Sequence, residues 1–188
     1  MDRKAEIKKL LQGIERYSPE HRNALEEHIL WQIHNNEYDL EANLALLRLY
    51  QFYPDRFNAE YAKLVLLKAM CNHSQSDFTL CKYLLNLEHL SKEPLSHVVE
   101  LGYLLETCRF TEFWIKLKEN PKMTASLSGF RESIYKCIFV GMHLTALTFT
   151  VECFIRCETN VIGIFKTVVY VFLKSFSERL ECADDPRF

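Results

Sequence analysis

The stretch that decides the fold is "YDLEANLALLRLYQFYP", residues 38–54, which carries five leucines between positions 40 and 49. Wound as a helix at about 100° per residue, it places Glu41 and Arg48 on one narrow strip, with Asn43 and Gln51 flanking. Apolar side chains cover most of the remaining circumference: Leu40, Leu44, Leu46, Leu47, Leu49 and Tyr50. A helix with so much apolar surface must be covered on more than one side. We therefore expect an inner helix of a layered stack, not one arm of an isolated hairpin.

The segment before it, "SPEHRNALEEHILWQIHNN" (residues 18–36), begins with a helix start signal. Ser18 is the expected N-cap and Pro19 the first helical residue, where no intrahelical partner exists for the missing N–H. Glu20 then adds an acid to the first turn, where the helix dipole favours it. These residues predict a helix that starts at Pro19.

The segment after it, "NAEYAKLVLLKAMC" (residues 58–71), has one polar side and one apolar side. Asn58 is the expected cap, and Glu60, Lys63 and Lys68 gather on one arc. The residues that lie away from this arc are apolar: Leu64, Leu67, Met70 and Cys71. The pattern predicts a helix that faces the core with one side.

Further segments of helix length follow: "SDFTLCKYLLNLEHL" (76–90), "EPLSHVVELGYLLETC" (93–108), "FTEFWIKLKEN" (110–120) and "SGFRESIYKCIFVGMHL" (128–144). Prolines punctuate the chain at intervals typical of two-helix repeats. We predict an all-α, HEAT-like helical repeat over residues 1–143, with an irregular helical bundle as the alternative. The leucines expected between its layers are Leu44, Leu47, Leu66, Leu84, Leu104 and Leu105.

Composition agrees with a globular helical chain without a strong charge bias. Of 188 residues, 48% are hydrophobic and only five are glycine, which argues against an all-β fold with its many turns. Because 23 basic residues face 25 acidic ones, no global field draws the chain to nucleic acid or anionic lipid. The charged start of the chain has no apolar signal segment, and seven cysteines without CxxC spacing favour reduced thiols in the cytoplasm.

We find no pattern of residues that predicts catalysis, a cofactor or a metal. Asp39 and Glu41 point about 160° apart on a helix, so they are expected to be a cap and a first-turn acid, not an acid–base pair. Two loose cysteine groups match no zinc spacing and are expected to be core or surface thiols: Cys153 and Cys157 near His143, and Cys71 with His73 and Cys81. Glycine-rich phosphate loops and hydrolase motifs are absent from the sequence.

Two other clusters have ordinary structural interpretations. The basic residues Arg3, Lys4, Lys8 and Lys9 spread over more than half of a helix circumference, as expected for a solvated face. The aromatics Phe110, Phe113 and Trp114 are expected to be mainly core, with one of them at a stack edge as the alternative, where it would anchor a partner.

The last 45 residues, 144–188, differ in character from the rest. They are rich in Thr, Val, Ile and Phe, which favour extended backbone, so a pair of strands is one interpretation and a tail packed on the helices is another. The longest stretch without Asp, Glu, Lys or Arg, residues 137–151, has 15 residues, fewer than the roughly 20 that span a bilayer. We expect no membrane helix.

Three strings, "YDLEANLALLRLYQFYP", "SDFTLCKYLLNLEHL" and "LGYLLETCRFTEFW", in this order and at these separations, resemble the k-subunit family of eukaryotic translation initiation factor 3. The resemblance runs from about Ile7 to about His143. It implies a HEAT-like domain followed by a winged helix, related to the PCI architecture. Residues 144–188 do not match the winged helix, so we expect a divergent tail, as from a splice variant or a gene-model read-through.

The resemblance also implies a function without catalysis. The family is part of the initiation factor that, with other factors, promotes recruitment of mRNA and initiator methionyl-tRNA to the small (40S) ribosomal subunit. The implied partners are other subunits of the factor, chiefly the l subunit, and the ribosome through the complex. Two alternatives stay open: a helical protein that contacts RNA or the ribosome directly, if only weakly, and a truncated form unable to join the complex. The residues that bind partners are unknown from the sequence.

Overall fold

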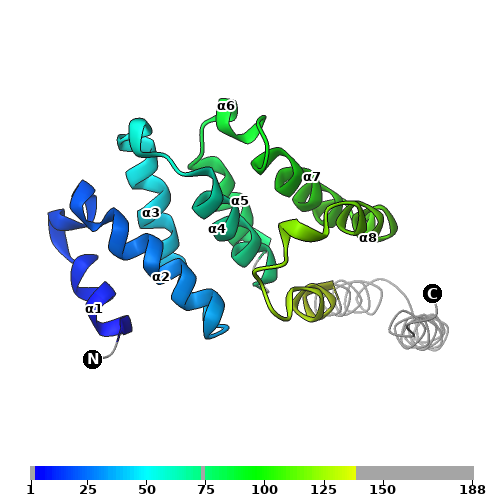
Figure 1. Cartoon of the computed structure of the whole chain (residues 1–188), viewed down its shortest axis with the longest axis horizontal. Coiled ribbons are helices and arrows are strands. Elements are labelled where there is room, and N and C mark those ends of the chain that lie inside the picture. Colours follow the sequence, from blue (N-terminus) through cyan, green and yellow to red (C-terminus); the bar gives the residue numbers. More distant parts are fainter. Residues whose placement is uncertain (1–2, 73–74, 139–188) are drawn as a thin grey trace, which may run out of the picture. The chain divides into compact units, whose positions relative to one another are not determined.

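The computed structural model describes residues 3–72 and 75–138, and this part of the chain is all-α (Figure 1). Helices and short 3₁₀ turns make up its regular structure, and no strand occurs in the described ranges. The predicted all-α class is confirmed. The expected boundary at residue 143 and the tail 144–188 lie outside the described residues.

Within residues 3–72 and 75–138, the α-helices and 3₁₀ turns (η) have these bounds: α1 (Arg3–Leu10), η1 (Gly13–Tyr17), η2 (Pro19–His21), α2 (Arg22–His34), α3 (Leu40–Phe52), η3 (Pro54–Arg56), α4 (Ala59–Cys71), α5 (Gln75–Tyr83), α6 (Leu87–Leu90), α7 (Leu95–Glu106), α8 (Phe110–Glu119) and η4 (Pro121–Met123). Residues 130–138 are helical as well.

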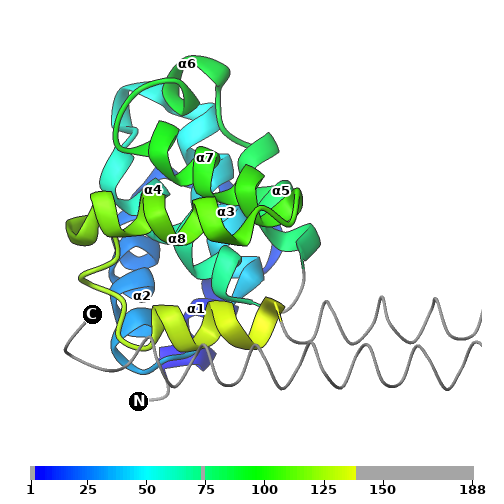
Figure 2. The same cartoon turned by 90° about the vertical axis from the view of Figure 1, so that its right-hand side faces the viewer.

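The helices form two packed layers. Successive helices pair as α2 with α3, α4 with α5, and α7 with α8. Alternate helices also touch, so that α2, α4 and α7 adjoin in one layer while α3 and α5 adjoin in the other. Figure 1 shows the pairs following one another from α2 to α8, and Figure 2 looks along this succession with α8 in front. This arrangement is the HEAT-like stack that the sequence predicts, since each pair covers the apolar side of its neighbour.

Helix α3 is the inner helix that its leucines predict. It contacts α2, α4, α5 and the turns η1 and η3, and Leu46 and Leu47 are completely buried. The expected polar strip is wrong at one position, because Asn43 is buried too. Its Oδ1 accepts a hydrogen bond of 2.9 Å from Nε2 of Gln32 on α2, which lets an amide occupy the interface between the two helices.

Three of the six leucines expected between the layers are buried: Leu47, Leu66 and Leu104. The other three are only half-buried, so these predictions were wrong. Leu44 borders a groove beside Arg16 and Arg48 on the outer side of α3. Leu84 follows the end of α5, where Leu85 takes the buried position. Leu105 lies beside the inward row of Leu101 and Leu104 on α7, because a helix turns about 100° per residue.

The expected caps hold for two helices and fail for one. Asp39 caps α3 by accepting from the Ala42 N–H, and Asn58 caps α4 by accepting from the Glu60 N–H, at 3.1 and 3.0 Å. The side chain of Ser18 makes no cap bond. Its backbone carbonyl accepts from the His21 N–H, and Pro19 begins the 3₁₀ turn η2 rather than the α-helix, which starts at Arg22.

Helix α4 has more covered surface than its sequence predicts. Leu64, Leu67 and Met70 are buried as expected, and Glu60 pairs with Lys63. The prediction was wrong for Lys68, which is only 8% exposed. The reason is that α2, α3, α5 and α7 all pack against α4, so the predicted polar arc is partly enclosed.

Candidate protein-interaction surface

Four of the exposed large apolar side chains come from three successive helices. Leu80 and Tyr83 lie on α5, Leu87 begins α6, and Tyr103 lies on α7. Tyr83 and Leu87 are 77% and 81% exposed, and about half of each of the other two is open to solvent. We call these four residues the α5–α7 surface. Because α7 contacts both α5 and α6, these exposed apolar side chains lie on neighbouring helices, as is typical of sites that bind other proteins.

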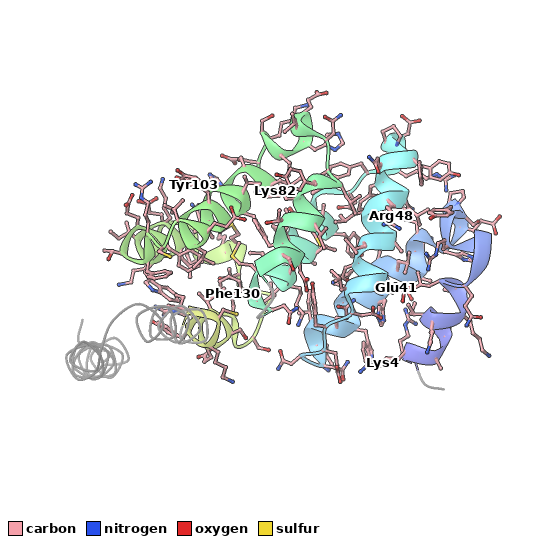
Figure 3. All side chains as sticks on the ribbon, turned by 180° about the vertical axis from the view of Figure 1, so that it is seen from behind. Lys4, Glu41, Arg48, Lys82, Tyr103 and Phe130 are labelled. Atoms are coloured by element: carbon pink, nitrogen blue, oxygen red, sulfur yellow. The ribbon has the colours of Figure 1, made fainter. Side chains whose placement is uncertain are left out.

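Polar side-chain contacts link α5 to α7 at this surface. Glu106 on α7 accepts a hydrogen bond of 3.1 Å from Thr79 Oγ1 on α5 and lies 3.7 Å from Nζ of Lys82. The same ammonium group lies 5.9 Å from the centre of the Tyr83 ring. Tyr103 is one turn before Glu106, and Figure 3 shows Lys82 and Tyr103 on neighbouring helices. The aromatic rings are therefore attached to helices that are tied to each other.

The two helices also approach very closely. Gly102 on α7 is buried against the Phe78 ring of α5. A Cβ atom at Gly102 would lie 2.2 Å from two ring carbons of Phe78, which is far inside van der Waals contact. A glycine is thus required for this approach. The close packing places the α5–α7 surface on rigid elements rather than on loops.

A buried polar network that the sequence analysis missed joins α2 to α3. Gln32 accepts from the backbone N–H of Asp39 at 2.9 Å through Oε1 and donates to Asn43 through Nε2. His28 Nε2 lies 3.2 Å from Oδ2 of Asp39, and the His28 ring stacks on Trp31. The signal for this network is the pair His28 and Gln32, four residues apart on the apolar side of α2. The network fixes how α2 and α3 pack; His28, Gln32 and Asn43 are fully buried in it, and the Asp39 side chain is 30% exposed.

Asp39 and Glu41 take the structural roles predicted for them. The hydrogen bond with His28 is the main cause that holds the pKa of Asp39 below its usual value, and the Ala42 N–H adds to it. Glu41 points to solvent and pairs with Arg16 at 2.8 Å. Each carboxylate therefore serves a different helix contact, and they do not form an acid–base pair.

Asp39→Ala is expected to lower the free energy of unfolding at neutral pH by about 0.5–2 kcal/mol, because the first turn of α3 loses its cap. The carboxylate has a lowered pKa in the folded chain, so its stabilisation exists above the unfolded pKa and is lost as the pH falls. The difference between wild type and Asp39→Ala should therefore shrink as the pH falls below about 4. Urea unfolding followed by far-UV circular dichroism at several pH values measures this.

Asn58→Ala is the matched control, since Asn58 caps a helix of the same length, 13 residues, through an uncharged amide. Its cost should not change over the same acid range. A pH-independent cost for Asp39→Ala as well would show that the carboxylate charge does not stabilise α3.

The thiols of Cys71, Cys81 and Cys137 do not resemble activated nucleophiles. Burial raises the pKa of both Cys71 and Cys81 to about 12, and burial also raises the pKa of Cys137. A catalytic thiol needs the opposite shift, because the thiolate is the nucleophile. His73, and the group of Cys153, Cys157 and His143, lie outside the described residues. Within residues 3–72 and 75–138, no group of His, Cys, Asp and Glu side chains is arranged to hold a metal ion.

The basic cluster at the N-terminus is largely engaged within the chain. Arg3 pairs with Glu27 and Lys4 with Glu37, each at 3.0 Å, and the Lys4 ammonium also lies over the Trp31 ring. Lys8 and Lys9 are exposed on α1. Half of this cluster therefore fastens α1 to the stack. In the described ranges, no helix combines the length and apolar content needed to cross a membrane.

The aromatics of α8 are mainly structural, as predicted. Phe113 is completely buried and Phe110 is half-buried. Trp114 is half-buried at the edge, where its ring centre lies 4.5 Å from that of Tyr135 and 5.7 Å from the guanidinium of Arg131. Trp114 therefore contacts the helix that contains Tyr135. Among the described residues, Tyr83 on α5, Phe52 on α3 and Tyr103 on α7 are more exposed aromatic side chains.

Comparisons with known proteins match this helical part of the chain. The model of the CSN8/PSMD8/EIF3K family matches residues 56–143. The chain is 42% identical over 146 residues to "Eukaryotic translation initiation factor 3 subunit K" of Homo sapiens and 43% identical over 146 residues to that of Xenopus laevis. These matches cover 78% of the chain and 66% of each relative, so the chain spans slightly less than two thirds of their length. A protein of the same name from Anopheles gambiae is 41% identical over 147 residues. The helical part of the chain is therefore similar to the CSN8/PSMD8/EIF3K family over residues 56–143.

Proposed function

We propose that this chain is a non-enzymatic subunit of the eukaryotic translation initiation factor 3 complex, which acts in the cytoplasm through protein–protein contacts. The complex, with other initiation factors, promotes recruitment of mRNA and initiator methionyl-tRNA to the small ribosomal subunit. The α5–α7 surface supports this proposal, because it lies inside the family match and leaves apolar side chains exposed on rigid helices. The identity to relatives named as subunit K supports the choice of complex.

The chemistry of the α5–α7 surface fits a protein partner. Tyrosine is enriched among the residues that dominate binding energy, because a large rigid ring with a polar tip buries much area at little entropic cost. Tyr83 and Tyr103 supply two such rings, with Leu80 and Leu87 beside them. Lys82 and Glu106 add one charge of each sign next to the rings. We assign the l subunit as the main partner of this surface, and the small ribosomal subunit as a contact of the whole complex.

Tyr83→Ala combined with Leu87→Ala is expected to weaken capture by the purified l subunit about tenfold or more, since truncating two central anchors removes more than about 1.4 kcal/mol of binding energy. A pull-down series over several concentrations of the l subunit measures this. Both side chains are mostly exposed, so the variant should fold and unfold like wild type.

The matched control is Leu30→Ala combined with Ile115→Ala, which removes two exposed apolar side chains from α2 and α8. It should bind like wild type. Equal capture of both double variants would reject the α5–α7 surface as the contact. Direct binding of RNA by this chain, with an affinity that falls steeply with added salt, would instead favour contacts with RNA phosphates, which release counterions on binding.

We further propose that residues 1–143 form the helical-repeat domain and carry the contact, with 144–188 as a separate tail. Residues 1–143 and the full chain should then be captured equally by the l subunit. A fragment that is folded by circular dichroism and still not captured would place the contact outside the helical stack.

A further inference from the structure

An open cleft of about 380 Å³ lies beside α4, and its walls are mainly polar. The loop after α2, the C-terminal half of α4 and the start of the helix at 130–138 form it, with Asn36, Lys68, Ser128, Ser133 and Lys136 among its lining residues. A smaller void of about 20 Å³, roughly the space of one water, adjoins Lys68 as well. The family match and the proposed function do not account for this cleft.

Lys68 is a largely buried cation beside the cleft, and Glu37 is the carboxylate that acts on it electrostatically. Lys68 is only 8% exposed. The acids around the cleft have other partners: Glu37 pairs with Lys4, and Asp77 accepts from Tyr38 Oη at 3.1 Å and from Asn72 Nδ2 at 2.6 Å. Burial lowers the pKa of Lys68, because the ammonium group loses hydration. Because Glu37 is also paired with Lys4, it compensates the buried Lys68 charge only in part, and a bound anion would lower the remaining cost.

The rest of the cleft adds further positive potential and hydrogen-bond donors. Ser128 and Gly129 line it directly before the first helical residue, Phe130, and the Ser133 N–H makes the first intrahelical bond to the Gly129 carbonyl. The N–H groups of this first turn have no intrahelical acceptor, and the helix dipole favours an anion there. Of the lining side chains, Lys68 and Lys136 are cationic and Glu132 is anionic, which leaves one net positive charge (two minus one).

We propose that this cleft binds a phosphoryl group, with Lys68 as its buried cationic contact and the start of the helix at 130 as a second contact. Serine hydroxyls and the Asn36 amide complete a set of donors suited to phosphate oxygens. The volume exceeds that of one phosphate ion, so the carrier of the phosphoryl group also has room. The inference does not depend on membership of an initiation complex.

The test is thermal unfolding of the full chain during titration with inorganic phosphate, at constant ionic strength kept with sodium chloride. Wild type should show a saturable rise in the unfolding midpoint, as mass action requires for a ligand of the folded state. Lys68→Met should remove this rise or weaken the apparent affinity about tenfold or more, since a charge-assisted contact is lost. A parallel titration with O-phospho-L-serine tests whether a phosphorylated side chain is the source of the group.

Two features keep the test decisive. Lys68→Met replaces a buried ammonium by an apolar chain of similar length, so it should fold and unfold at a higher midpoint than wild type without phosphate. Lys63→Met, on the same helix but outside the cleft, should retain the saturable phosphate effect. The proposal is overturned by no saturable effect in wild type, or by an equal effect in Lys68→Met, which would reflect general salt stabilisation.

Discussion

Leu66→Ala is expected to lower the free energy of unfolding by about 2–5 kcal/mol. Leu66 is completely buried on α4, the helix that contacts α2, α3, α5 and α7. Removing three carbons there loses their transfer free energy and leaves a cavity that helices on several sides cannot easily close. Urea unfolding followed by far-UV circular dichroism measures the change, with the slope against urea concentration checked for equality to wild type.

Leu84→Ala is the matched control, because Leu84 has the same side chain and is only half-buried after the end of α5. It should cost clearly less than Leu66→Ala. Equal costs at the two sites would mean that α4 is not the centre of the packed stack. A cost for Leu66→Ala below about 1 kcal/mol, typical of surface sites, would contradict complete burial.

The periodic pattern of apolar residues predicted the helices well, because burial on one side of a helix leaves a period that can be read directly. For α3 it also predicted the inner position, since too few polar residues remained for an exposed face. The pattern could not predict that Leu66 is more buried than Leu84, because both are leucines in helical segments. That difference depends on which helices cover each residue, and this is a property of the packing and not of the local sequence.

Two polar residues are more buried than the helical pattern predicts. Helix periodicity put Asn43 beside the polar strip of α3 and Lys68 on the polar arc of α4, yet both side chains are buried. Asn43 is accommodated by a partner on another helix, Gln32, which local sequence cannot reveal. Lys68 is enclosed by helices that pack around α4. In both cases the burial depends on contacts with other helices, which the spacing of residues within one helix does not reveal.

The candidate interaction surface was harder to predict than the fold. Tyr83, Leu87 and Tyr103 have the same residue types as the core, and no motif distinguishes them. Their exposure follows from the end of α5 at Tyr83, the short helix α6, and the inward side of α7 formed by Val98, Leu101 and Leu104. The sequence resemblance indicated a binding protein, and only the packing indicated where exposed apolar side chains lie.

Gln32→Met is expected to lower the free energy of unfolding by about 2–5 kcal/mol, although methionine fills nearly the same volume. It removes the acceptor of the Asp39 N–H and the donor to Asn43 Oδ1, and each unsatisfied buried group costs about 1–3 kcal/mol. Gln51→Met, at an exposed position of α3, is the control and should change stability by less than about 0.5 kcal/mol. Urea unfolding measures both variants.

Adding Asn43→Leu to Gln32→Met should restore part of this stability, at least about 1 kcal/mol, instead of adding a second loss. Leucine has the shape of asparagine without its polar atoms, so the double variant no longer buries an unpaired Asn43 amide. That amide already has one unsatisfied atom in the described part of the chain, Nδ2. The two substitutions are therefore coupled through one contact, and a double-mutant cycle measures the coupling. If the changes in the free energy of unfolding were strictly additive, water would hydrate the amides at the α2–α3 interface. Each amide would then stabilise the interface independently of the other.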